Sequence, residues 1–157
     1  MDETGRPFDD YGYLLELIDF AIRKEVEAAA FYTDLAAQVD SDTVAAELRR
    51  LASMEKEHQN RLEKLNVAAA SWKVSPRITD VKLADYLVTA EPRPGMSRHE
   101  LLRIAIGREV ASMRLYTDMA TALPDSLFKQ LLQNLAGEEA LHKQYIERLQ
   151  KEDSAAG

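Results

Sequence analysis

Apolar residues recur at alternating spacings of three and four in four segments of this chain, and no other sequence feature constrains the fold as strongly. Such spacing places one stripe of side chains, here called a seam, along one side of an α-helix, where it packs against the other helices of a bundle. The sequence therefore predicts an all-α four-helix bundle. We expect helices near residues 11–39, 42–66, 98–122 and 125–150.

Residues that favour helix ends separate these segments. Ser41 and Asp42 can cap the second helix, and Ser97 with Glu100 forms a capping box for the third. Pro124 is predicted in the first turn of the fourth helix, where its missing N–H is harmless. The loops within each pair of helices are short, so the first two helices form one antiparallel hairpin and the last two another.

A long connection, residues 67–97, joins the two hairpins. Its three prolines exclude one continuous helix, although the spacing within 79–88 predicts a short one. Trp72 and Tyr86 are expected to pack it onto the bundle. A connection of this length can run along the whole bundle, which is the one-crossover topology of ferritin-like folds.

The chain also contains an internal repeat, because a shift of 84 residues aligns it with itself without a gap. The matched positions include Ala21 with Ala105, Glu25 with Glu109, Tyr32 with Tyr116, Leu51 with Leu135, Glu55 with Glu139, and His58 with His142. Two hairpins of one design are expected to pack about a pseudo-twofold axis, so each half should contribute the same side chains to a shared site.

Six ionisable residues occupy seam positions: Glu25, Glu55, His58, Glu109, Glu139 and His142. A buried carboxylate costs several kcal/mol unless it is paired or binds a metal. Two divalent cations would balance four carboxylates, and the members of each Glu-x-x-His pair lie about 5–6 Å apart at Cβ on one helix face. One such pair alone would be weak support. Two pairs and two further glutamates match the arrangement in di-iron and di-manganese bundles, so the sequence predicts a two-metal site.

The residues around this set are assigned less specific roles. Tyr32 and Tyr116 lie two turns beyond a seam glutamate. They either fill the core, or their hydroxyls orient a carboxylate or relay a proton or an electron. The remaining acidic neighbours and the third histidine are expected at the surface: Glu27, Glu57, Glu138 and His99.

Composition limits the classes of function. The net charge of −7 without a basic stripe argues against nucleic acid or an anionic membrane as a partner, and no apolar run is long enough to cross a bilayer. The polar N-terminus does not resemble a secretory signal, so we expect a cytoplasmic protein. The absence of cysteine excludes disulfides and iron–sulfur clusters. Residues 1–157 are predicted as a single domain with flexible tails at 1–9 and 152–157.

The chain resembles the rubrerythrin-like branch of the ferritin-like superfamily in four motifs. They are A-I-R-K-E-V-E-A-A-A-F-Y at 21–32, L-A-S-M-E-K-E-H at 51–58, A-I-G-R-E-V-A-S-M-R-L-Y at 105–116 and L-A-G-E-E-A-L-H at 135–142. The resemblance implies that the six seam residues bind two iron ions, with Glu55 and Glu139 as bridging ligands. Manganese or zinc can substitute for iron in such ligand sets.

The same resemblance implies a di-iron oxidoreductase that reduces hydrogen peroxide or O₂ in oxidative stress, and a homodimer. The alternative is a ferroxidase, or an iron-handling or storage protein of the ferritin type, which would use the same six ligands. Two features depart from typical rubrerythrins. There are no cysteines for a rubredoxin-like domain, so the electron donor is expected to be a separate molecule, such as a rubredoxin-like protein. Ser112 stands where typical members have a seventh glutamate on the third helix.

Overall fold

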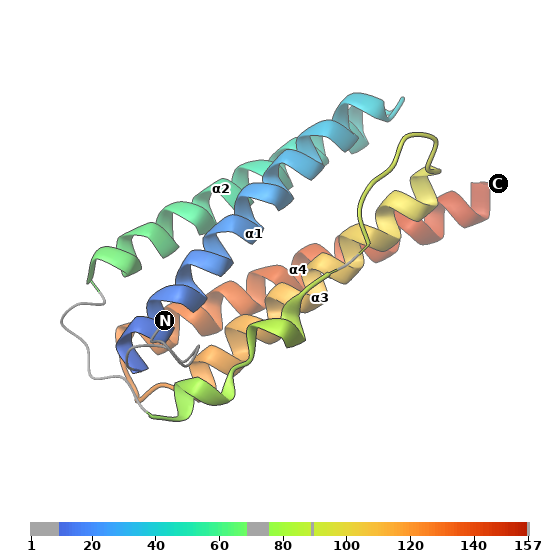
Figure 1. Cartoon of the computed structure of the whole chain (residues 1–157). Helices are drawn as coiled ribbons and strands as arrows, with labels where there is room; N and C mark the ends of the chain where they lie inside the picture. Colours follow the sequence, from blue (N-terminus) through green and yellow to red (C-terminus); the bar gives the residue numbers. More distant parts are fainter. Residues whose placement is uncertain (1–9, 69–75, 89, 157) are drawn as a thin grey trace.

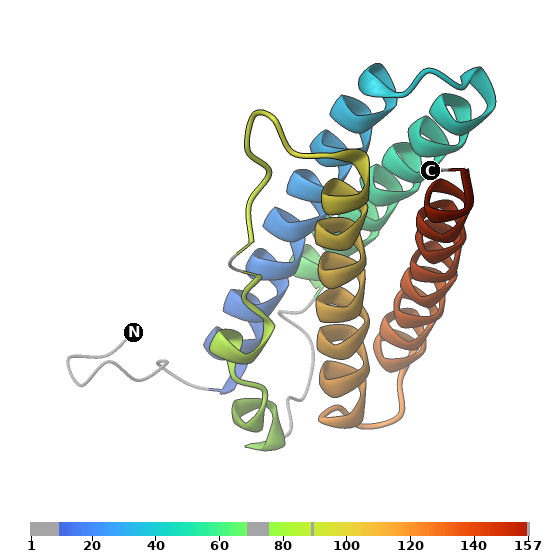
Figure 2. The ribbon, with the colours of Figure 1, turned by 90° about the vertical axis from the view of Figure 1, so that its right-hand side faces the viewer.

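Four α-helices form a bundle in the structure, a computed structural model that describes residues 10–68, 76–88 and 90–156. The helices are α1 (Asp10–Gln38), α2 (Asp42–Ala68), α3 (Arg98–Thr121) and α4 (Leu127–Ala156). Helix α1 packs along α2, and α3 packs along α4, as two antiparallel hairpins (Figures 1 and 2). The described part of the chain contains no β-strand. The predicted helices and their pairing are therefore confirmed.

The capping residues act as predicted at two helix starts. At α3, Glu100 N–H donates to Ser97 Oγ over 3.1 Å, and Ser97 N–H donates to Glu100 Oε2 over 2.9 Å, which completes a capping box. At α2, the N–H of Val44 donates to Ser41 Oγ over 3.2 Å. Each interaction satisfies backbone donors that the first helical turn leaves without an internal partner.

The prediction that Pro124 lies in the first turn of the fourth helix was wrong. Pro124 precedes α4, which begins at Leu127. Ser126 sets this boundary because its side-chain oxygen accepts the N–H of Lys129 over 3.1 Å, the bond typical of an N-cap. At its other end α4 continues to Ala156, six residues beyond the predicted residue 150.

The connection forms two short 3₁₀-helices, η2 (Pro76–Asp80) and η3 (Leu83–Tyr86), in place of the one predicted helix. It reaches α3 at the end of the bundle opposite the end of α2, so it runs along the bundle as the one-crossover topology requires (Figures 1 and 2). Tyr86 is buried and donates its hydroxyl to Asp118 Oδ2 on α3 over 2.6 Å, which fastens the connection as expected. Trp72 lies outside the described residues.

The core is divided into two apolar clusters. In α1, Leu14, Leu17 and Ile18 belong to one cluster, whereas Leu35 belongs to the other. The other three helices also contribute residues to both clusters. In every helix, the buried ionisable residues lie between the residues of one cluster and the residues of the other. The polar centre is therefore closed by apolar packing toward both ends of the bundle. No helix among the described segments is long and apolar enough to span a lipid bilayer.

Candidate metal centre

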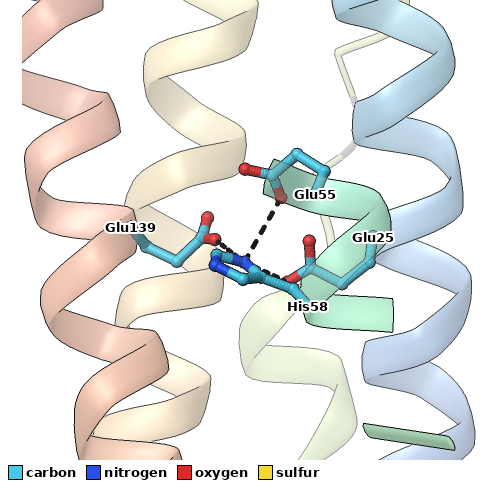
Figure 3. Close-up of side chains that lie close together, drawn as sticks. All are labelled: Glu25, Glu55, His58 and Glu139. Carbon is cyan, nitrogen blue, oxygen red and sulfur yellow. Dashed lines mark ion pairs between the residues drawn. The ribbon is translucent and has the colours of Figure 1, made fainter. Parts of the chain in front are cut away.

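All six ionisable seam residues meet inside the bundle, and each has only 1–2% of its surface exposed. Helix α1 supplies Glu25 and α3 supplies Glu109. Helices α2 and α4 each supply a glutamate and a histidine one turn apart, namely Glu55 with His58 and Glu139 with His142. Figure 3 shows the side chains of Glu25, Glu55 and Glu139 directed toward the ring of His58 from three different helices.

The six residues form two overlapping groups, and within each group the nearest donor atoms all lie within 4.8 Å of one another. The first group contains Glu25, Glu55, His58 and Glu139, and the second contains Glu55, Glu109, Glu139 and His142. Glu55 and Glu139 belong to both groups. A carboxylate that bridges two metal ions must likewise be close to both sets of ligands. The two imidazole rings are stacked, with centroids 5.7 Å apart and planes inclined by 9°.

Each histidine directs its Nδ1 atom at the carboxylates. His58 Nδ1 lies 2.6 Å from Glu139 Oε1 and 3.6 Å from Glu25 Oε1. His142 Nδ1 lies 2.6 Å from Glu55 Oε1 and 3.8 Å from Glu109 Oε1. The distances are similar in the two hairpins, which therefore present matching sets of donor atoms.

Seven polar atoms of this centre are buried and form no well-oriented hydrogen bond, although His58 Nδ1 and His142 Nδ1 each lie 2.6 Å from a glutamate oxygen. They are Glu25 Oε2, Glu55 Oε1, His58 Nδ1, Glu109 Oε2, Glu139 Oε1, His142 Nδ1 and His142 Nε2. Buried polar atoms are almost always paired in folded proteins, and each one left unpaired costs about 1–3 kcal/mol or more when charged. Such a concentration of unpaired carboxylate and imidazole atoms fits a pair of divalent cations, whose preferred ligands these are.

Tyr32 and Tyr116 each donate a hydrogen bond to a carboxylate of the opposite hairpin. The Tyr32 hydroxyl on α1 donates to Glu109 Oε1 on α3, and the Tyr116 hydroxyl on α3 donates to Glu25 Oε1 on α1. In both glutamates the second oxygen, Oε2, stays unpaired. Each tyrosine therefore fixes one carboxylate oxygen and leaves the other free to bind, which favours the orienting role over simple core filling.

Crowding of the carboxylates changes their protonation. Burial raises the pKa of Glu55 and of Glu139 well above the usual range, and the charges of the neighbouring glutamates raise it further. Burial also raises the pKa of Glu109, but its interactions with Glu139, His142 and Tyr32 outweigh burial and the net pKa is lowered. Without metal, the centre must therefore hold protons that metal binding would displace.

Sequence reasoning missed Glu138, which was expected at the surface. Its Oε2 lies 3.1 Å from His58 Nε2, and Arg61 donates two hydrogen bonds to it, over 2.8 Å to Oε2 and 3.3 Å to Oε1. Burial lowers the pKa of His58, but Glu25 and Glu138 more than offset this and the net pKa is raised. The available signal was the adjacency of Glu138 to Glu139. Glu27, Glu57 and His99 are exposed as expected.

A narrow pocket reaches the centre between α1 and α3. It offers about 20 Å³ of free space, roughly what one water molecule needs. Ala28, Ala111 and Ser112 line it, Lys24 and Arg108 contribute cationic side chains, and its lining includes the centre's own Glu109 and Glu139. Ser112 therefore lies beside a small opening to the carboxylates.

Comparison with known proteins agrees with this geometry. The rubrerythrin family model matches residues 16–84, which hold Glu25, Glu55 and His58. Among solved structures, a Thermotoga maritima protein described as ferritin-like and diiron-carboxylate has a similar fold, with a TM-score of 0.72 and 21% sequence identity. The match covers 88% of this chain and 95% of that one. No curated protein matches the sequence.

Residues 16–84 are similar to the rubrerythrin family. The resemblance seen in the sequence motifs is confirmed, and so is the ferritin-like four-helix bundle built from two hairpins. The family match covers most of the first hairpin and part of the connection, whereas the structural similarity extends to most of the second hairpin. In this ferritin-like bundle, the second hairpin supplies the residues that the 84-residue repeat pairs with those of the first.

Proposed function

We propose that the protein binds two iron ions between its hairpins and uses them to reduce hydrogen peroxide. The observation that carries the proposal is the buried set of four glutamates and two histidines, with seven donor atoms left unpaired. Glu55 and Glu139 would bridge the ions. Glu25 with His58 would complete one position, and Glu109 with His142 the other. Manganese or zinc could occupy the same ligands.

Two bound ferrous ions would supply the two electrons that convert hydrogen peroxide and two protons into two water molecules. The four carboxylates favour the ferric state because their negative charge balances the added positive charge. The Tyr32 hydroxyl holds one oxygen of Glu109, and the Tyr116 hydroxyl holds one oxygen of Glu25. The second oxygen of each glutamate has no hydrogen-bond partner and is therefore available to a metal ion.

The size of the pocket supports a small oxidant. The pocket beside the centre offers about 20 Å³, room for a molecule similar in size to water, and apolar clusters pack on both sides of the centre. Hydrogen peroxide and O₂ are both small enough. Electrons for the next cycle would come from a separate donor, and the working unit would be a homodimer.

Rapid mixing of the anaerobic, iron-loaded protein with either oxidant tests the proposal. We expect two ferrous ions per chain, and faster oxidation by hydrogen peroxide than by O₂. Glu25→Gln should reduce iron binding and the reaction with peroxide. Glu63→Gln, which removes an exposed charge from α2, serves as the matched control and should change neither.

Equal or faster oxidation by O₂, together with more than two ferric ions held per chain, would instead favour ferroxidase or storage activity. A large closed assembly in solution would support that alternative, whereas a dimer would oppose it. Binding of fewer than two ions by the unmodified protein would contradict the proposed centre itself.

A further inference from the structure

The two histidines of the centre have different partners behind them, although the 84-residue shift pairs their ligand atoms. The ring of His58 has Glu138 of α4 at its Nε2 atom. The same shift places Met54 of α2 at the equivalent position for His142. His142 Nε2 is buried and has no hydrogen-bond partner. The repeat is therefore broken directly behind the ligands.

Glu138 is well placed to fix the protonation pattern of His58. Arg61 donates to both of its oxygens, so the guanidinium supplies the hydrogens of that contact and the Glu138 oxygens act as acceptors. His58 Nε2, 3.1 Å away, must then carry the proton of that bond. In a neutral ring this leaves the lone pair on Nδ1, the atom directed at the carboxylates. The His58 ring is therefore already in the tautomer that can bind a metal through Nδ1.

His142 lacks this support. A proton on its Nε2 would be buried without an acceptor, which is unfavourable. A proton on its Nδ1 has an acceptor in Glu55 Oε1, 2.6 Å away, but blocks the atom that a metal needs. Binding at this ring therefore requires a less favourable tautomer. Hydrogen-bond partners behind a ligating histidine typically change metal affinity by about 10–100-fold.

We propose that Glu138, held by Arg61, is a positioning residue that makes the two metal positions unequal. The ion bound by Glu25 and His58 enters first, and the ion bound by Glu109 and His142 enters second and more weakly. This inference rests on the proposed two-metal centre. It concerns the order and affinity of binding, so it is tested without measuring the oxidation reaction.

Anaerobic titration of the metal-free protein with Co²⁺ alone, followed by visible absorption and calorimetry, measures both affinities. We expect two ions per chain in two steps whose dissociation constants differ by about 10–100-fold. The hyperfine-shifted N–H proton of a cobalt-bound histidine should appear with the first equivalent. His58→Gln should abolish that early signal, and His142→Gln should retain it.

Two substitutions give His58 and His142 the same kind of neighbour and so test directly whether Glu138 causes the difference in affinity. Glu138→Met gives both histidines the same neighbour, and should weaken the first step until the two steps merge. Met54→Glu supplies the carboxylate missing behind His142, and should strengthen the second step toward the first. Glu138→Gln keeps a hydrogen-bond acceptor and should restore part of the affinity lost in Glu138→Met. If Glu138→Met does not fold, Met54→Glu and Glu138→Gln carry the test.

Two steps of equal affinity in the unmodified protein would overturn the inference while leaving the two-metal centre intact. An equal loss at both positions in Glu138→Met, or unchanged binding in Met54→Glu, would also overturn it. Binding of fewer than two Co²⁺ ions by the unmodified protein would instead contradict the proposed centre, and the inference with it.

Discussion

The metal-free protein is expected to lose stability as the pH rises. Burial and the neighbouring carboxylates raise the pKa of Glu55 and of Glu139 well above the usual range. Each therefore binds a proton more tightly in the folded chain than in the unfolded one. Their stabilising contribution is complete below the unfolded pKa of about 4.3 and is lost as the pH rises toward the folded pKa.

The size of the effect follows from the number of groups. One group contributes a slope of about 1.4 kcal/mol per pH unit between its two pKa values, so the interacting pair Glu55 and Glu139 gives at most about twice that. His58, whose pKa is also raised, adds to the decline above about pH 6.5. The lowered pKa of Glu109 acts in the opposite sense, and its contribution is lost as the pH falls below about 4.3. A change of two pH units is thus comparable with the whole stability of many domains, about 5–15 kcal/mol.

Urea unfolding of the metal-free protein in steps from about pH 4.5 to about pH 8.5 measures the slope. Glu55→Gln should reduce it, because an amide does not titrate, whereas the exposed-site control Glu63→Gln should leave it unchanged. The metal-loaded protein should behave differently, since metal competes with protons for the same ligands and stabilises more at higher pH. A metal-free protein whose stability stays constant between about pH 5 and about pH 8, or an unchanged slope in Glu55→Gln, would refute this reasoning.

Three further predictions concern the bundle that holds the centre. Tyr86→Phe removes the hydrogen bond to Asp118 and should lower the free energy of unfolding by about 1–2 kcal/mol in urea, with the iron stoichiometry unchanged. Ser126→Ala should lower the free energy of unfolding by about 0.5–2 kcal/mol, because α4 loses its N-terminal cap. Pro124→Ala, which lies outside the helix, should lower it by less. An equal or larger effect of Pro124→Ala would contradict the assigned start of α4. Leu48→Ala, in the core on α2, should cost about 2–5 kcal/mol, measured by thermal unfolding, and a smaller loss would mean that the core collapses around the missing side chain.

The sequence alone determined the helices, the hairpins and the six residues that meet in the centre. Helix periodicity depends only on spacing along the chain, so the seams could be identified without knowing their partners. The repeat then placed Glu25 and Glu109 at matching positions. The buried cluster follows, because residues on seams of equal register converge when the hairpins pack face to face. The assignment of these residues as metal ligands stays a prediction.

Only the tertiary structure decided which side chains bond to one another across the hairpins. Tyr32 shares a helix with Glu25 but donates to Glu109, and Glu138 approaches His58 from a helix 80 residues away in the sequence. Such contacts depend on the axial stagger and rotation of packed helices, which spacing within one helix does not specify. Glu138 lies off the seam, yet the rotation of α4 against α2 brings its carboxylate to the back of the imidazole, where Arg61 holds it.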